Sequence, residues 1–298
     1  MDFEEEIASF CDSLAFEREM ARNTCEAYAR DLRDFAEWGC RNGRTSVAGL
    51  SREDVQEYLR EEREKGLSQA TRARRLVAVK ELCRHLKERG MAPGDPTEFI
   101  EMPRRARPLP RILGEDEVAR MIDGIGGDAP QDLRDRAMLE VMYGSGLRVS
   151  ETCALKTGDF VADGELLRVN GKGSKDRLVP VGASAGNALT AYFASARGVL
   201  SHGRTDEHVF LTRLGRPFTR QGVFKVVRER AAAAGIAADR ISPHVLRHCF
   251  ASHMLQHGAD IRAIQEMLGH ADIGTTQIYT HIDTGKFGEL HRRFHPRG

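Results

Sequence analysis

Apolar residues recur at three- and four-residue spacing through the first ninety residues, and this spacing predicts a series of amphipathic helices. The first such stripe is Phe3, Ile7, Phe10 and Leu14. A serine followed three residues later by an aspartate, Ser51 and Asp54, resembles a helix capping signal. The helices are expected at residues 3–19, 24–39, from Ser51 onward, and at 69–89. Together they predict an N-terminal domain of four helices.

The fourth of these helices has two different faces. Its apolar stripe contains Leu76, Val79, Leu82 and Leu86. The basic side chains fall mostly off that stripe, so one face can pack while another meets phosphates. The residues predicted to contact DNA from this helix are Arg72, Arg74 and Arg75.

A proline-rich segment follows these helices. It contains five prolines between residues 93 and 110, and proline resists helix formation and removes backbone donors. We therefore predict a linker that ends an N-terminal domain of residues 1–107 and precedes a second domain of residues 108–298. Within the linker, Arg105 and Arg107 are further candidate DNA contacts.

The second half of the chain mixes helical and strand patterns, so the fold class is expected to be mainly α with a small β-sheet. Two strands at 165–169 and 177–181 flank the glycine-rich turn GKGSK, which predicts a hairpin. The expected helices are 115–125, 132–143, 148–155, 183–197, 219–234, 243–257, 260–268, 274–281 and one near 284–294.

Charge is unevenly distributed although the formal net charge is only +1. Residues 1–40 hold eleven acids and four bases, whereas residues 68–89 hold seven bases and two acids. A protein that binds phosphates needs basic charge on one face rather than overall. A solvated helix face would give the same pattern, so charge alone leaves both interpretations open.

Composition favours a cytoplasmic protein without a membrane partner. The chain starts with the acidic segment MDFEEEIASF and has no apolar run near the ~20 residues that span a bilayer. Its six cysteines are scattered without a close pair, which fits reduced thiols and excludes a Cys-x-x-Cys motif.

Four short motifs in the second domain carry candidate chemistry. In SPHVLRHCF, Ser242 is a good N-cap and Pro243 a good first helical residue. His244 and Arg247 then share a face at the positive end of a helix, where an anion is favoured. The other three motifs, GSGLRVSE, NGKGSKDR and LGHADIGTTQIYTHI, contribute Arg148, Lys172, His270 and Tyr279.

Two other interpretations compete with catalysis. Tyr279 can be a packing aromatic, since most tyrosines bury their ring. His244 with His248, and His253 with His257, have the spacing of zinc ligands on a helix. However, the HExxH pattern is absent and a zinc site needs at least a third protein ligand, so no metal is expected.

Taken together, the motifs fit the attack of a tyrosine hydroxyl on a phosphodiester. Arginines can hold the non-bridging oxygens, and a lysine can protonate the leaving 5′-oxygen. Histidines can take the phenolic proton, and the tyrosine divides one displacement into two steps through a covalent intermediate. Side chains supply all the cations, so neither a metal nor a nucleotide cofactor is required.

The series formed by Arg148, Lys172, His244, Arg247, His270 and Tyr279 resembles the tyrosine recombinases (the lambda-integrase family) in identity and order. The segments FLTRLGRPFTRQG, LGHADIGTTQIYTHI and the terminal HPRG are similar to the Xer group of that family. The resemblance implies that Arg148 and Arg247 clamp the phosphate, Lys172 is the general acid and Tyr279 the nucleophile. It also implies that His244 and His270 are the supporting acid–base residues.

The resemblance also implies the biological partners. These are duplex DNA at a dif-type site, a XerC-like recombinase in a cyclic heterotetramer and an FtsK-type DNA translocase, which act together to resolve chromosome dimers. Other readings of the same residues are an integrase of a mobile element, a DNA-binding protein that no longer cuts, and a type IB topoisomerase.

The C-terminal segment, residues 286–298, carries Phe287, Leu290 and Phe294 at helical spacing. A stripe this short should be buried against another surface. Its periodicity fits docking on its own domain and docking on a neighbour equally well. The resemblance favours a neighbouring subunit.

Overall fold

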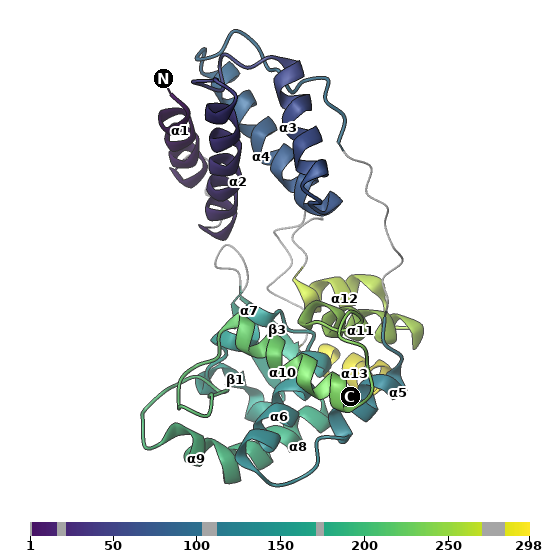
Figure 1. The fold of residues 1–298 in the computed structure, drawn as a ribbon. Helices are drawn as coiled ribbons and strands as arrows, with labels where there is room; N and C mark the ends of the chain where they lie inside the picture. Colours follow the sequence, from purple (N-terminus) through teal and green to yellow (C-terminus); the bar gives the residue numbers. More distant parts are fainter. Residues whose placement is uncertain (1, 17–21, 103–111, 171–175, 270–283) are drawn as a thin grey trace. The chain divides into compact units, whose positions relative to one another are not determined.

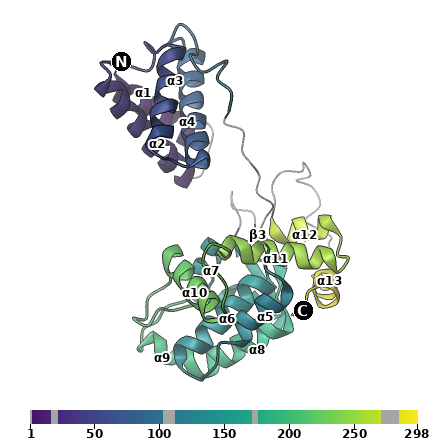
Figure 2. The same cartoon turned by 45° about the vertical axis from the view of Figure 1, so that its right-hand side comes forward.

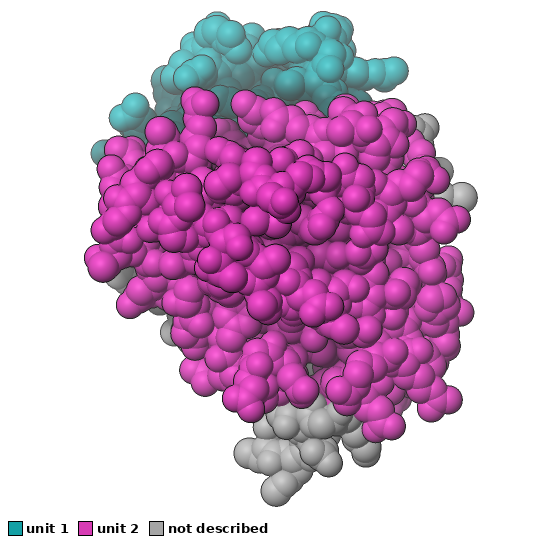
Figure 3. Space-filling model, turned by 90° about the horizontal axis from the view of Figure 1, so that it is seen from below, with its two compact units in different colours: residues 1–108 teal, residues 109–298 magenta. Residues whose placement is uncertain are grey.

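The computed structural model describes residues 2–16, 22–102, 112–170, 176–269 and 284–298. The chain forms two compact units, residues 1–108 and 109–298, which Figure 3 colours separately. None of the described helices has both the length and the apolar character needed to cross a bilayer.

Unit 1 contains four helices within its described residues (Figure 1). The aromatic side chains Phe10, Phe35, Trp38 and Tyr58 lie at the centre of its core. The predicted capping box is present at Ser51 and Asp54. The apolar stripe of the fourth helix is buried as predicted. The helices are α1 (Phe3–Phe16), α2 (Arg22–Arg41), α3 (Arg52–Glu64) and α4 (Gln69–Glu88).

The first part of the predicted linker is packed against unit 1. Ile100 is buried in the helical core, and the Lys80 Nζ donates a hydrogen bond to its carbonyl at 2.6 Å. Asp95 accepts from the backbone N–H of Thr97 at 2.8 Å, a turn that redirects the chain onto α4. Proline content marked this segment as non-helical without showing that it would pack. Residues 103–111 lie outside the described residues.

Unit 2 is built around α6, which packs against α5, α8 and α11 (Figures 1 and 2). The helix predicted at 183–197 is α-helical only as far as Tyr192. A π-helical turn at Phe193–Arg197 follows it directly. The helix predicted at 274–281 lies outside the described residues. The described helices are α5 (Glu115–Asp123), α6 (Pro130–Gly144), α7 (Val149–Ala154), α8 (Ala183–Tyr192), α9 (Gly198–Ser201), α10 (Arg220–Ala233), α11 (Pro243–Gln256), α12 (Ile261–Leu268) and α13 (Thr284–Phe294).

A small antiparallel sheet in the order β1-β2-β3 completes unit 2. Strands β2 (Leu166–Asn170) and β3 (Asp176–Pro180) pair with Leu167 opposite Val179, so the predicted hairpin is confirmed. The additional strand, β1 (Phe160–Val161), was not predicted, because two residues are too short to show an alternating pattern. The predicted class, mainly α with a small β-sheet, is confirmed.

The C-terminal helix α13 docks on its own unit in this single chain, and its docking on a neighbouring subunit stays a prediction. Its apolar stripe packs against the core of unit 2, and the His291 Nε2 donates to the Gly144 carbonyl at 2.6 Å. Beyond the helix, Arg297 forms ion pairs with Glu140 and Asp123. The stripe and the terminal arginine therefore both find partners within the chain.

Candidate active site

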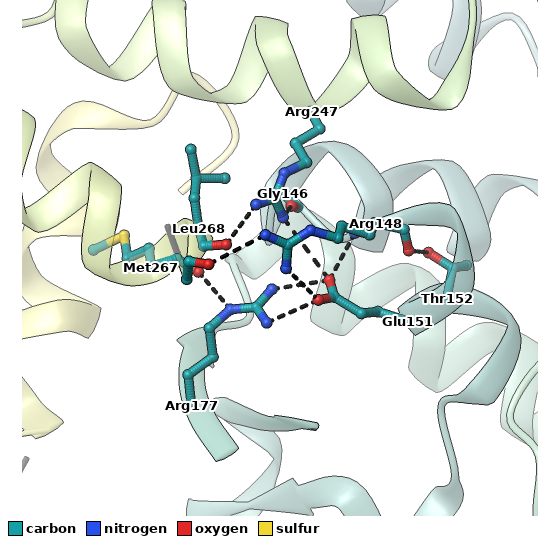
Figure 4. Close-up of polar contacts among 9 residues, drawn as sticks. Gly146, Arg148, Glu151, Thr152, Arg177, Arg247, Met267 and Leu268 are labelled. Carbon is teal, nitrogen blue, oxygen red and sulfur yellow. Dashed lines mark hydrogen bonds and ion pairs between the residues drawn. The ribbon is translucent and has the colours of Figure 1, made fainter. Parts of the chain in front are cut away.

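The side chains of two predicted catalytic residues, Arg148 and Arg247, converge in unit 2 (Figure 4). Arg148 is the N-cap residue of α7. Arg247 lies on α11, which starts as predicted: the Ser242 hydroxyl accepts from the Val245 N–H at 3.3 Å and Pro243 is the first helical residue. The N-terminal caps of α7 and α11 therefore fix the backbone positions of both arginines.

The carboxylate of Glu151 lies between these arginines. It accepts from the backbone N–H of Arg148 at 2.7 Å and from the Arg148 guanidinium at 2.8 Å. Arg177, on β3, donates to both of its oxygens at 2.8 and 2.9 Å, and Arg247 lies 3.8 Å away. Burial raises the pKa of Glu151, but hydrogen bonds from Arg177 and Arg148 outweigh burial and lower it overall. Glu151 is therefore ionised at neutral pH.

The same three arginines hold the C-terminus of α12, where backbone carbonyls have no partner within the helix. The Arg177 Nε donates to the Met267 carbonyl at 2.8 Å, and Arg148 donates to Gly269 at 3.2 Å. Arg247 donates to the carbonyl of Leu268, the residue between Met267 and Gly269. Three consecutive carbonyls at the negative end of the helix thus each accept from one guanidinium.

This cluster holds more positive than negative charge. Arg148, Arg177 and Arg247 surround the single carboxylate of Glu151, which leaves two positive charges in excess among these four residues. Burial and the nearby charge of Arg148 lower the pKa of Arg247 to about 10, so it is still protonated at pH 7. An anion bound between Arg148 and Arg247 would relieve this repulsion. Such a site can bind a phosphodiester and stabilise the further negative charge of its transition state.

The structure brings together only part of the predicted catalytic set. His244 is exposed in the first turn of α11, one turn before Arg247. Lys172, His270 and Tyr279 lie outside the described residues, so their roles stay predictions.

The alternative zinc interpretation of the histidine pairs is not supported at His253. This residue is buried, and both of its ring nitrogens have protein partners. Its Nε2 donates to the Leu113 carbonyl at 2.9 Å, so its Nδ1 accepts from the hydroxyl of Tyr143 at 2.8 Å. Neither nitrogen is left for a metal. Among the residues that the structure describes, no three His, Cys, Asp or Glu side chains are grouped as a metal site.

In unit 1, the arginines predicted to contact DNA differ in their surroundings. Arg75 is paired with Glu62 at 2.6 Å and with Asp34, and its side chain is only 16% exposed. The side chain of Arg74 pairs with Asp31 but is 42% exposed, and Arg72 is half-buried. DNA contact by Arg75 would require it to leave carboxylates inside the unit. Arg105 and Arg107 lie outside the described residues.

Replacing both Arg72 and Arg74 with methionine is expected to weaken DNA binding and flatten its salt dependence. The slope of log affinity against log salt should fall by roughly 0.9 for each lost phosphate contact. Arg74→Met and the matched variant Arg75→Met should both lower the melting temperature, because the buried Asp31 and Glu62 each lose an arginine. Arg75→Met should leave the slope nearly unchanged. Fluorescence anisotropy over a salt series, with thermal unfolding, measures both effects. An unchanged slope in the folded double variant would show that Arg72 and Arg74 face solvent and do not contact phosphates.

Sequence reasoning missed two residues of the cluster, Glu151 and Arg177. A signal existed for Glu151, since it is three residues beyond Arg148, the position at which a capping-box acid returns to the N-cap backbone. Arg177 gave no comparable signal, because its partners Glu151 and Met267 are distant in sequence.

The chain is similar to known proteins over nearly its whole length. Residues 111–286 match the phage integrase family, and residues 7–90 match the phage integrase N-terminal SAM-like domain. The curated tyrosine recombinase XerD of Ralstonia nicotianae is 42% identical over 295 residues, 99% of this chain and 95% of that protein. XerD of Pseudomonas aeruginosa is 40% identical over 292 residues, 98% of this chain and 97% of that protein.

Solved structures share the fold. The XerH site-specific recombinase bound to difH substrate in a pre-cleavage complex has a TM-score of 0.68 at 23% identity, covering 95% of this chain and 82% of that one. A lambda integrase dimer bound to a COC′ core site has a TM-score of 0.67 at 16% identity, covering 93% of this chain and 100% of that one.

Proposed function

Because this chain belongs to the phage integrase family and is a site-specific tyrosine recombinase of the XerD type, we propose that it cuts and rejoins duplex DNA through a 3′-phosphotyrosine intermediate. The observation that supports this chemistry best is the arginine cluster. Arg148 and Arg247 converge beside Glu151 with two uncompensated positive charges, which suits a phosphodiester whose charge grows during displacement.

Each predicted residue has one part in this reaction. The Tyr279 hydroxyl attacks the scissile phosphorus and forms a phosphotyrosine bond, while the bond to the 5′-oxygen breaks. Lys172 gives a proton to that leaving oxygen. His244 and His270 take the phenolic proton and hydrogen-bond the phosphoryl group. Arg148 and Arg247 hold the non-bridging oxygens throughout.

The second step reverses the first with a different strand. The phosphotyrosine bond keeps the energy of the broken phosphodiester, so a free 5′-hydroxyl from another duplex can displace the tyrosine. Lys172 then takes the proton of the attacking 5′-hydroxyl, and the histidines return a proton to the tyrosine oxygen. Strand exchange therefore proceeds without an external energy source.

The proposed biological role is the resolution of chromosome dimers in the cytoplasm. The substrate would be duplex DNA at a dif-type site, with a XerC-like recombinase as partner in a cyclic heterotetramer and an FtsK-type translocase as activator. Curated XerD relatives that match nearly the whole chain support this role. The XerH complex with a difH substrate is a further relative in fold.

A suicide substrate tests this function directly. A duplex carrying the dif-type site of the source chromosome, nicked beside the scissile phosphate, loses its short fragment after cleavage and traps the covalent complex. We expect an adduct that survives denaturant, with strand exchange only when the XerC-like partner is added. An adduct on the attachment site of a mobile element, but not on the dif-type site, would identify an integrase. Binding without an adduct on either would contradict the proposal.

A further inference from the structure

We propose that Arg177 is a positioning residue of this active site, which holds Glu151 so that the guanidinium groups of Arg148 and Arg247 remain available to phosphate. This inference rests on the proposed function, because it concerns the same arginine pair.

Arg177 is the most buried of the three arginines in the cluster. Its side chain is 6% exposed, against 10% for Arg247 and 34% for Arg148. All three of its nitrogen atoms are already engaged: two donate to the Glu151 carboxylate, and the third donates to the Met267 carbonyl. Arg177 therefore acts on the reaction only through its neighbours.

The contacts made at position 177 require a planar guanidinium. It meets Glu151 through both terminal nitrogens as a bidentate fork and reaches the end of α12 through its Nε (Figure 4). A lysine offers a single nitrogen and cannot keep both contacts. The backbone also fits closely here, because a Cβ on Gly269 would lie 3.0 Å from the Cδ of Arg177. Gly269 itself has a φ of 63°, a conformation that favours glycine.

Arg177 has an electrostatic effect on the phosphate site as well. It neutralises Glu151, whose carboxylate otherwise has Arg148 and Arg247 as its nearest cations. Without Arg177, Glu151 would shorten its 3.8 Å ion pair with Arg247 to hydrogen-bond distance. The excess positive charge would be halved, and Arg247 would be turned away from the phosphate.

The test separates DNA binding from cleavage. The variants are Arg177→Lys, which keeps the charge, and Arg177→Met, which removes it. The matched control is Arg230→Met, which breaks another arginine–carboxylate pair in unit 2, with Asp135. Half-site affinity is measured by anisotropy, and the single-turnover cleavage rate is measured on the suicide substrate at saturating protein. We expect near-normal affinity in both Arg177 variants and cleavage slowed by about 10²-fold in Arg177→Met, the scale of a misplaced catalytic group.

A double-mutant cycle distinguishes positioning from a general loss of stability. If Arg177 acts through Glu151, Arg177→Lys should add little to the cleavage defect of Glu151→Gln, whereas Arg230→Met should combine additively with it. Arg177→Lys should recover part of the rate that Arg177→Met loses. If Arg177→Met does not fold, the folded Arg177→Lys variant decides the question by the same cycle.

Two results would overturn the inference: wild-type cleavage in folded Arg177→Lys, or full additivity with Glu151→Gln. Absence of an adduct with the wild-type protein would instead contradict the proposed function.

Discussion

Replacing Tyr279 with phenylalanine is expected to abolish the covalent protein–DNA complex and to leave DNA binding intact. The substitution removes one hydroxyl oxygen and keeps the ring, so packing is preserved while the nucleophile is lost. The chain has five tyrosines, which makes the alternatives few. Burial raises the pKa of Tyr58, Tyr143 and Tyr192, which disfavours the phenolate at each of these positions.

The measurement is adduct formation on the suicide substrate, resolved under denaturing conditions, beside a gel-shift titration of the same protein. Tyr192→Phe is the matched control, because the Tyr192 hydroxyl donates to the Val209 carbonyl and accepts from the Leu211 N–H, both inside unit 2. That variant should still form the adduct. If Tyr279→Phe also formed a denaturant-resistant adduct, the nucleophile would be another residue.

The parts of the fold that sequence predicted well are those set by local interactions. Apolar periodicity and caps such as Ser51 and Ser242 determine helices from residues within a few positions of one another. The strand β1 is too short to show an alternating pattern, and the π-helical turn after Tyr192 gave no local signal. The periodicity of α13 predicted an apolar face, but it could not show which surface covers it.

In unit 1, the charge pattern of the sequence also did not show which charges pair. The sequence has an acid-rich start, residues 1–40, and a basic helix, α4, with no indication that the two meet. In the structure they partly neutralise each other, since Asp31 and Asp34 of α2 pair with Arg74 and Arg75 of α4. A helix that is basic in sequence therefore presents less free positive charge than its composition suggests.

In the candidate site, sequence order predicted that Arg148 and Arg247 act together but not how they are held. Arg148 and Arg247 were predicted, and the structure places them around one carboxylate. The support from Glu151 and Arg177 comes from contacts between a helix and a strand, which no local spacing encodes.

Arg247→Met is expected to slow cleavage by roughly 10³- to 10⁵-fold, the scale of an arginine that stabilises the charge of a phosphoryl transition state. Half-site affinity should fall much less, because one contact among many is lost. The lowered pKa of Arg247, about 10, leaves it charged at pH 7, so a drop in pH from 8 to 6 should not change its contribution. Arg240→Met, which removes a bidentate partner of Glu117 elsewhere in unit 2, is the matched control and should cleave normally.

A neutral substrate separates charge stabilisation from structural support by Arg247. In the folded protein this side chain also donates to the carbonyls of Gly146 and Leu268, so its loss could act by displacing the end of α12. A methylphosphonate at the scissile position carries no negative charge and needs less neutralisation. If Arg247 acts on charge, the ratio of wild-type to variant cleavage rates should shrink on this substrate. An equal defect on both substrates would show that Arg247 supports the fold of the site rather than the transition state.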